Sequence, residues 1–166
     1  MVLICYDGSE DARAAIERAG VLMGGQPAIV LTVWEPYIHV LGRSAGGLGP
    51  VFGVARMEEF DRDMREQADR RAAEGTKLAR EAGLDATPRT CAQETSTADA
   101  ILSEAQAVGA EAIVMGCRGL TGVRSLLLGS VSHAVMQHAD RTVMVVPSAR
   151  VAASRAQARN ARRDSP

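Results

Sequence analysis

Short apolar runs alternate with longer segments of helical periodicity along most of this chain. Four runs have the composition of buried strands, namely residues 2–6, 28–33, 111–115 and 142–146. A less apolar run at 86–91 predicts a weaker strand near a sheet edge.

The segments between these runs carry apolar residues at every third or fourth position, as on the buried face of a helix. Capping residues and glycines mark where these helices begin or end: Ser9, Gly24, Gly83, Thr97 and Gly129. Strands and helices thus alternate from one end to the other. This order predicts an α/β fold, an open parallel sheet with helices on both faces. Such sheets bind ligands at the carboxyl ends of their strands, where the winding direction reverses.

Two segments depart from the alternation. Residues 36–55 contain two prolines and several glycines, which predicts a long loop. Within it we expect residues 42–55 to be mobile and to form a flap over a ligand. Residues 149–166 contain five arginines and one aspartate and have little to bury. We therefore expect one domain over residues 1–148, followed by an Arg-rich tail that is disordered or loosely helical.

The overall composition excludes several kinds of partner. The 166 residues carry a net charge of −1, so the whole chain has no electrostatic attraction to nucleic acid or to a membrane. Five aromatic residues are too few to stack on single-stranded nucleic acid. No apolar stretch reaches membrane-spanning length, and Met1 leads directly into a strand. We expect a cytoplasmic protein that binds neither nucleic acid nor membrane.

The potential metal ligands are scattered along the sequence. Cys5, Cys91 and Cys117 form no Cys-x-x-Cys pair and show no ligand spacing with the three histidines. This distribution argues against a disulfide framework and against a zinc site.

The segment most informative about chemistry is a glycine-containing loop over residues 116–132, between a buried strand and a helix. Gly129-Ser130 opens that helix, so free N–H groups and the positive end of the helix dipole are available to an anion such as phosphate. The loop lacks the Gly-Lys-Ser/Thr of a Walker A motif and the Gly-x-Gly-x-x-Gly of a dinucleotide site. Glycine spacing alone is equally compatible with a loop that only turns the chain.

A longer pattern makes the interpretation specific. Gly116, Gly119, Gly129 and Ser130 form Gly-x2-Gly-x9-Gly-Ser, which resembles the ATP-binding signature of universal stress proteins. The Ile-Cys-Tyr-Asp-Gly-Ser start and the strands at 113–116 and 143–147 are also similar to that family. The resemblance implies a five-stranded parallel sheet in the order 3-2-1-4-5, with the nucleotide at the carboxyl ends of strands one and four.

The resemblance also implies the nucleotide-binding residues. Asp7 would contact the adenosine part and Val33 the adenine, while the glycines would let the loop approach ribose and phosphates. Backbone N–H groups and hydroxyls at the start of the last helix would bind phosphate. The full candidate set is Asp7, Val33, Met115, Gly116, Arg118, Gly119, Gly129, Ser130, Val131 and Ser132. Cys5 departs from the family pattern, because some ATP-binding members have proline there, and this leaves the detail of the adenine pocket open.

Several of these residues have structural alternatives. Asp7 could cap the first helix, and Arg118 and Arg124 could lie in solvent instead of neutralising phosphate. Cys117 could be a redox-sensitive thiol or a small apolar filler of the loop. His133 and His138 have no evident acidic partner and more often belong to a surface or core than to a catalytic base.

Three functions remain open from the sequence. The first is a regulatory module in the stress response that binds ATP, or ADP or AMP, with Mg²⁺ accompanying the phosphates. The second is a slow ATPase or phosphotransferase, although Glu10 and Asp11 are as readily explained as helix-start residues as they are as a base. The third is a nucleotide-free dimeric scaffold. We expect a homodimer, since the apolar strand at 142–146 would otherwise leave a bare sheet edge, and the resemblance implies antiparallel pairing of that strand with its twofold mate.

Overall fold

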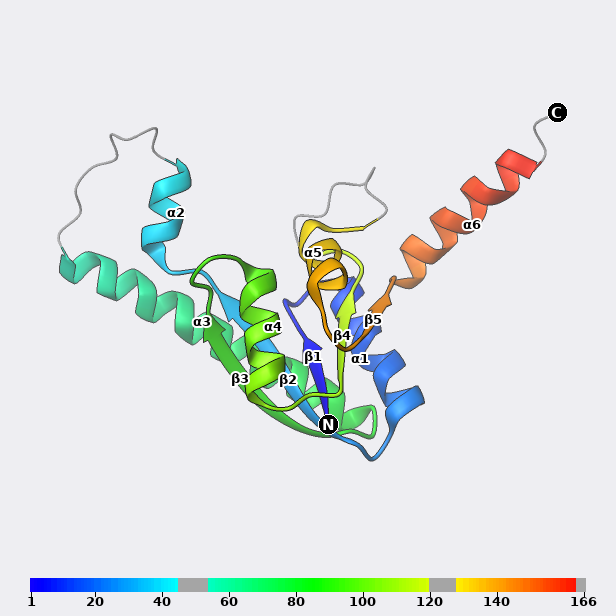
Figure 1. Ribbon diagram of the computed structural model, residues 1–166, viewed down its shortest axis with the longest axis horizontal. Helices are drawn as coiled ribbons and strands as arrows, with labels where there is room; N and C mark the ends of the chain where they lie inside the picture. The colour runs from blue at the N-terminus through cyan, green and yellow to red at the C-terminus, as the bar shows by residue number, and fades with distance from the viewer. Residues whose placement is uncertain (45–53, 120–127, 164–166) are drawn as a thin grey trace.

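The computed structural model describes residues 1–44, 54–119 and 128–163. Its centre is a parallel sheet of five strands in the order β3-β2-β1-β4-β5, so the predicted fold class and strand order are confirmed (Figure 1). The strands are β1 Val2–Cys5, β2 Pro27–Trp34, β3 Asp85–Ala92, β4 Ala112–Gly116 and β5 Thr142–Val146. In the register of the central strands Leu3 lies between Ile29 of β2 and Ile113 of β4.

Helices connect the strands and continue past the last one. They are α1 Glu10–Met23, α2 Tyr37–Ser44, α3 Val54–Glu81, α4 Thr97–Ala107, α5 Ser130–His138 and α6 Ala149–Arg163. The expectation of a loop over 36–55 is wrong for Tyr37–Ser44, which form α2. Tyr37 at the start of α2 stacks on Phe60 of α3, with ring centroids 4.4 Å apart. The glycine-rich composition of the segment could not predict this tertiary contact. Most of the proposed flap, residues 45–53, lies outside the described residues.

The sheet is covered on both faces. Alternate residues of β1 point to opposite sides, so Val2 and Ile4 pack with α1 and α3, while Leu3 packs with α4 and α5. The contact with α3 is close at Gly75, where a Cβ atom would lie 2.7 Å from the ring of Tyr6. Each face of the sheet thereby has its own apolar core. The central strands β1 and β4 are buried over most of their length, as their unbroken apolar runs predict, whereas the edge strands β3 and β5 are partly exposed.

The winding direction changes between β1 and β4. From β1 the chain proceeds outward to β2 and β3, and then crosses back to place β4 and β5 on the other side. The loops that follow β1 and β4 therefore diverge and leave a crevice at this edge of the sheet. In Figure 1 the start of α5 lies above the end of β4 at this edge.

The segment after β5 is the helix α6. Figure 1 shows that its first turns leave the top of β5 and that its later turns extend away from the sheet. Val151 in the first turns is buried, at 5 % exposure. No helix in the described part of the chain is long and apolar enough to cross a membrane.

Candidate functional site

The turn after β1 positions the first candidate residue. Gly8 has φ of +87°, a left-handed conformation that favours glycine, and it brings Asp7 back over the start of α1. Oδ1 of Asp7 accepts a hydrogen bond of 2.9 Å from the backbone N–H of Ser9. Ser9 is the N-cap of α1, because its Oγ accepts from the N–H of Ala12 at 3.1 Å. One carboxylate oxygen of Asp7 thus stabilises the start of the helix by accepting this hydrogen bond.

Two glycines bring the β4 end of the loop against α1. A Cβ atom on Gly116 would lie 2.7 Å from the carbonyl carbon of Asp11, so glycine lets β4 and α1 pack closely. A Cβ atom on Gly119 would lie 2.7 Å from Oδ2 of Asp7. The first glycine therefore serves packing between elements, and the second brings the loop backbone directly beside the Asp7 carboxylate.

The start of α5 is fastened to the same loop. Gly129 is the N-cap, and its N–H donates to the carbonyl of Cys117 at 2.8 Å. The buried Oγ of Ser132 donates to the same carbonyl at 2.9 Å. The N–H groups that open α5 at Ser130 and Val131 belong to a first turn, which has no carbonyl of its own helix to bind. Ser132 supports the loop, while Ser130 is exposed at the helix start.

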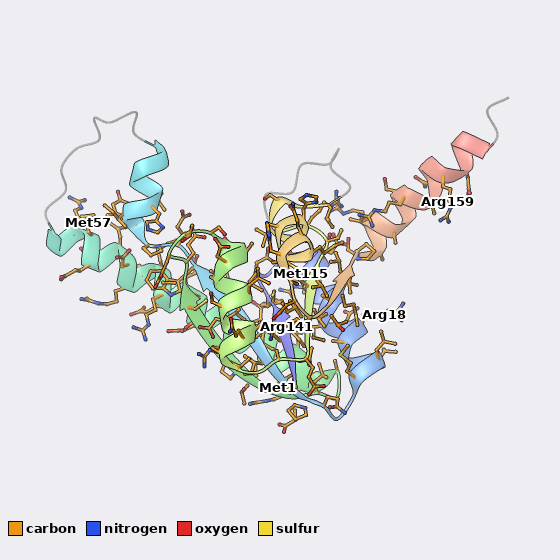
Figure 2. The ribbon with its side chains drawn as sticks, in the orientation of Figure 1. Met1, Arg18, Met57, Met115, Arg141 and Arg159 are labelled. Atoms are coloured by element: carbon orange, nitrogen blue, oxygen red, sulfur yellow. The ribbon has the colours of Figure 1, made fainter. Side chains whose placement is uncertain are left out.

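These segments enclose a cavity of about 580 Å³, a size ordinary for a small-molecule site. The candidate residues that line it are Asp7, Val33, Met115, Gly116, Arg118, Gly119, Gly129, Ser130 and Val131. Ser132 is not part of the lining. Figure 2 labels Met115, which lies near the end of β4. The structure therefore gathers the ends of β1, β2 and β4 and the start of α5 around one cavity.

The far side of the cavity carries polar residues that the sequence reasoning missed. Gln93 follows β3 and is 7 % exposed, and its Oε1 accepts a 2.7 Å hydrogen bond from Oγ1 of Thr97 at the start of α4. Glu35 follows β2 and lines the same cavity. The available signal was their position directly after predicted strands, a position that they share with Asp7.

A buried carboxylate lies behind the glycine loop. Asp11 of α1 is 4 % exposed and accepts hydrogen bonds from Sγ of Cys117 at 2.9 Å and from the N–H of Ser148 at 3.2 Å. Nε of Arg118 is 3.7 Å from Oδ2 of Asp11. Burial acts to raise the pKa of Asp11, but the bonds from Cys117 and Ser148 and the charge of Arg118 outweigh it and hold that pKa below 3.8.

The thiols of this region are protonated at neutral pH. Burial, together with the hydrogen bond to Asp11, raises the pKa of Cys117 to about 11. Burial and the nearby Asp7 raise the pKa of Cys5 to about 12. A reactive cysteine requires a lowered pKa, so the environment of Cys117 favours a loop-filling role over a redox role.

Three other residues considered from the sequence are not among the residues that line this cavity. His133 and His138 are exposed on α5, and Arg124 falls outside the described residues. In the described ranges no group of three or more His, Cys, Asp or Glu side chains could hold a metal ion.

The sequence compares directly with known proteins. The model of the universal stress protein family matches residues 1–147. This chain belongs to the universal stress protein family. It is similar to a universal stress protein of Thermus aquaticus, encoded 3′ of the QAH/OAS sulfhydrylase, at 33 % identity over 147 residues, which are 87 % of this chain and 96 % of the relative.

Solved structures share the universal stress protein fold. The hypothetical protein MJ0577 is 21 % identical with a TM-score of 0.71, over 88 % of this chain and 94 % of that one. A universal stress protein in complex with cAMP is 23 % identical with a TM-score of 0.59, over 89 % of this chain and 97 % of that one. At these identities the likeness establishes the fold.

Proposed function

We propose that this universal stress protein is a regulatory module that binds an adenine nucleotide, with ATP as the preferred ligand, and serves the stress response through that occupancy. The observation that carries the proposal is that the candidate residues meet at one cavity. Residues that are far apart in sequence line one cavity at the switch point of the sheet, and this is where open α/β folds bind ligands.

The cavity has the chemistry of a nucleotide site. One end is lined by the first turn of α5 and by Arg118, and helix N–H groups and a positive charge suit phosphates. The middle is apolar, with Val33, Ile101 and Met115 suited to the face of a base. In this arrangement Asp7 accepts from the ribose hydroxyls beside Gly119. Mg²⁺ would be carried by the phosphates.

The far end of the cavity suits recognition of the base edge. Gln93 presents an amide that can both donate and accept, and the hydroxyl of Thr97 fixes its Oε1 side. An amide is the group that pairs with an adenine edge in two-point recognition. The structural neighbour solved with cAMP shows that a protein of this fold accommodates an adenine nucleotide, which supports the same ligand class here.

The proposed active unit is a homodimer. Within the described residues β5 pairs only with β4, and its Val143 and Val145 are half-buried. Antiparallel pairing with a second copy would satisfy the outer edge of β5.

The deciding experiment identifies what the protein carries and what it binds. Purified protein is denatured, and the released small molecules are analysed by mass spectrometry. Ligand-stripped protein is then titrated by calorimetry with ATP, ADP, AMP, cAMP and GTP. We expect ATP, ADP or AMP in the extract and tighter binding of ATP than of GTP. An empty extract together with no heat from any adenine nucleotide would refute the proposal.

Turnover is measured in the same preparation. We expect phosphate release on the order of one ATP per minute or less, far below the ~10 per second of a median enzyme. Several turnovers per second, abolished by one carboxylate substitution, would instead identify an ATPase.

A further inference from the structure

Helix α6 leaves the domain past the free edge of the sheet. Strand β5 is outermost on the side opposite to β3, and Figure 1 shows that α6 extends beyond it, away from the sheet. The helix starts on the face that α1 covers, because Nε of Arg150 pairs with Glu10 of α1 at 3.1 Å and Val151 is buried. The arm formed by α6 therefore begins on the α1 face and extends across the edge of β5.

The same face of the sheet carries an apolar groove along α1. Val21 and Leu22, in the last turns of α1, are 75 % and 60 % exposed. They line a groove of about 650 Å³ together with Met144 and Val146 of β5. A contiguous exposed apolar surface of this kind is typical of an interaction site, and here it adjoins the free edge of β5.

A second copy paired with β5 would bring its own α6 to this groove. Antiparallel pairing relates the two copies by a twofold axis perpendicular to the sheet, and this axis leaves both α1 helices on the same face. It also places the carboxyl end of one β5 beside the amino end of the other. Because α1 runs from the carboxyl edge to the amino edge of the sheet, Val21 and Leu22 lie at the amino edge. The α6 that follows the second copy's β5 therefore starts close to them.

We propose that each protomer of the homodimer lays its α6 across α1 of the other protomer, so that the groove beside Val21 and Leu22 is filled by α6 of a second copy of this chain. This inference rests on the proposed pairing of β5 and extends it to a segment beyond residue 147, where the match to the family model ends. The 15 residues of α6 span about 22 Å. With strands about 4.8 Å apart, this length is enough to cross β5 and β4, the strands on which α1 packs.

The strand pair alone makes a small interface. Strand β5 has 5 residues, whereas a protein interface of standard size buries about 800 Å² on each protomer and engages about 20–30 residues of each. Two contacts between α6 and α1, related by the twofold axis, add apolar area on both protomers. Ala149, Ala152, Ala153 and Ala156 share one face of α6, and their small side chains let a second helix approach closely.

The test asks which protomer supplies the α6 that contacts α1. Two full-length chains with different affinity tags are co-expressed, one with Val21→Cys and the other with Gln157→Cys at an exposed position of α6. The doubly tagged dimer is treated with a short bismaleimide crosslinker and run on a denaturing gel. We expect a covalent product with the summed mass of the two chains.

Two further preparations serve as controls. Replacing Val21→Cys by Met136→Cys moves the new thiol to α5, on the opposite face of the sheet, at a residue 53 % exposed. This pair should give no more crosslinked product than the wild type, whose own three cysteines set the background. A single chain that carries both Val21→Cys and Gln157→Cys shows the alternative, in which α6 folds back on α1 of its own protomer and the link stays within one chain.

Light scattering on the wild type separates the outcomes. A dimer mass together with a link between the two chains supports the inference. A dimer mass with the link confined to one chain, or with no link above the Met136→Cys control, refutes the inference and leaves the proposed homodimer in place. A monomer mass refutes both, and the nucleotide proposal still stands or falls by calorimetry.

Discussion

Gly119 lies so close to Asp7 that a Cβ atom on the glycine would be 2.7 Å from Oδ2 of the carboxylate. The two residues are more than a hundred positions apart, in the turn after β1 and the loop after β4. Their contact joins the two segments that diverge at the switch point, and it depends on the absence of a side chain at residue 119.

Gly119→Ala should therefore weaken adenine nucleotide binding more than it destabilises the fold. The new methyl group displaces either Asp7 or the loop, and we expect a loss of affinity of about tenfold, or 1.4 kcal/mol. Calorimetry with ATP and a thermal melt measure the two effects. Affinity equal to wild type in a folded variant would show that the Asp7–Gly119 contact has no part in binding.

Gly129→Val should weaken ATP binding by at least tenfold, about 1.4 kcal/mol. A Cβ atom there would lie 3.3 Å from the carbonyl oxygen of Cys117 and 3.4 Å from Cα of Arg118, so a branched side chain pushes the loop away from the start of α5. Ser130→Ala should weaken ATP binding less, because the backbone donors remain. Gly129→Ala is the matched control and should fall between wild type and valine, since φ at residue 129 is −71°.

Light scattering at micromolar concentration should give the mass of a dimer. Leu22 of α1 is 60 % exposed and lines a groove between α1, β5 and α6, beside the free edge of β5. Leu22→Arg should shift the protein towards monomer, whereas Met136→Arg, at a residue 53 % exposed on α5, should not. A monomer mass for the wild type would contradict the proposed pairing of β5.

The three cysteines should react slowly with a thiol reagent while the protein is folded. Burial raises the pKa of Cys5 to about 12 and those of Cys91 and Cys117 to about 11, so at pH 8 about one thiol in a thousand or fewer is ionised. In denaturant all three should react at once with Ellman's reagent. If Cys117 in the folded protein reacts as fast as free cysteine, a redox role for this residue is supported instead.

Asp11→Asn should lower the free energy of unfolding at pH 7 by about 2 kcal/mol, the cost of leaving buried donors poorly paired. The pKa of Asp11 is held below its ordinary 3.8 in the folded state, so its carboxylate stabilises the fold above that pH. This contribution is lost as pH falls through the folded-state pKa. Urea unfolding at pH 7 and at pH 3 should show a smaller difference between variant and wild type at the lower pH.

Most of the fold followed from the sequence. Unbroken apolar runs such as residues 2–6 identify strands buried on both faces, and alternation with helices requires parallel connections. The strand order and the candidate ligands came from the resemblance carried by Gly116, Gly119 and Gly129, because local periodicity cannot rank strands within a sheet. Helix α2 was missed because prolines and glycines dominate the composition of residues 36–55, whereas the contact of Tyr37 with Phe60 joins it to another helix.

The sequence alone predicted that the segments after the strands at 2–6 and 111–115 line one candidate cavity, since residues after parallel strands meet at one edge of the sheet whatever their separation along the chain. Only the tertiary structure decided what each residue does there. It shows Gly116 making room for α1, Ser132 bracing the loop, and Gln93 with Thr97 closing the far end of the cavity. It also brings Arg155 of an apparently solvated tail beside Cys117. Such pairings depend on distances across the fold, and a one-dimensional pattern of polar and apolar residues does not contain those distances.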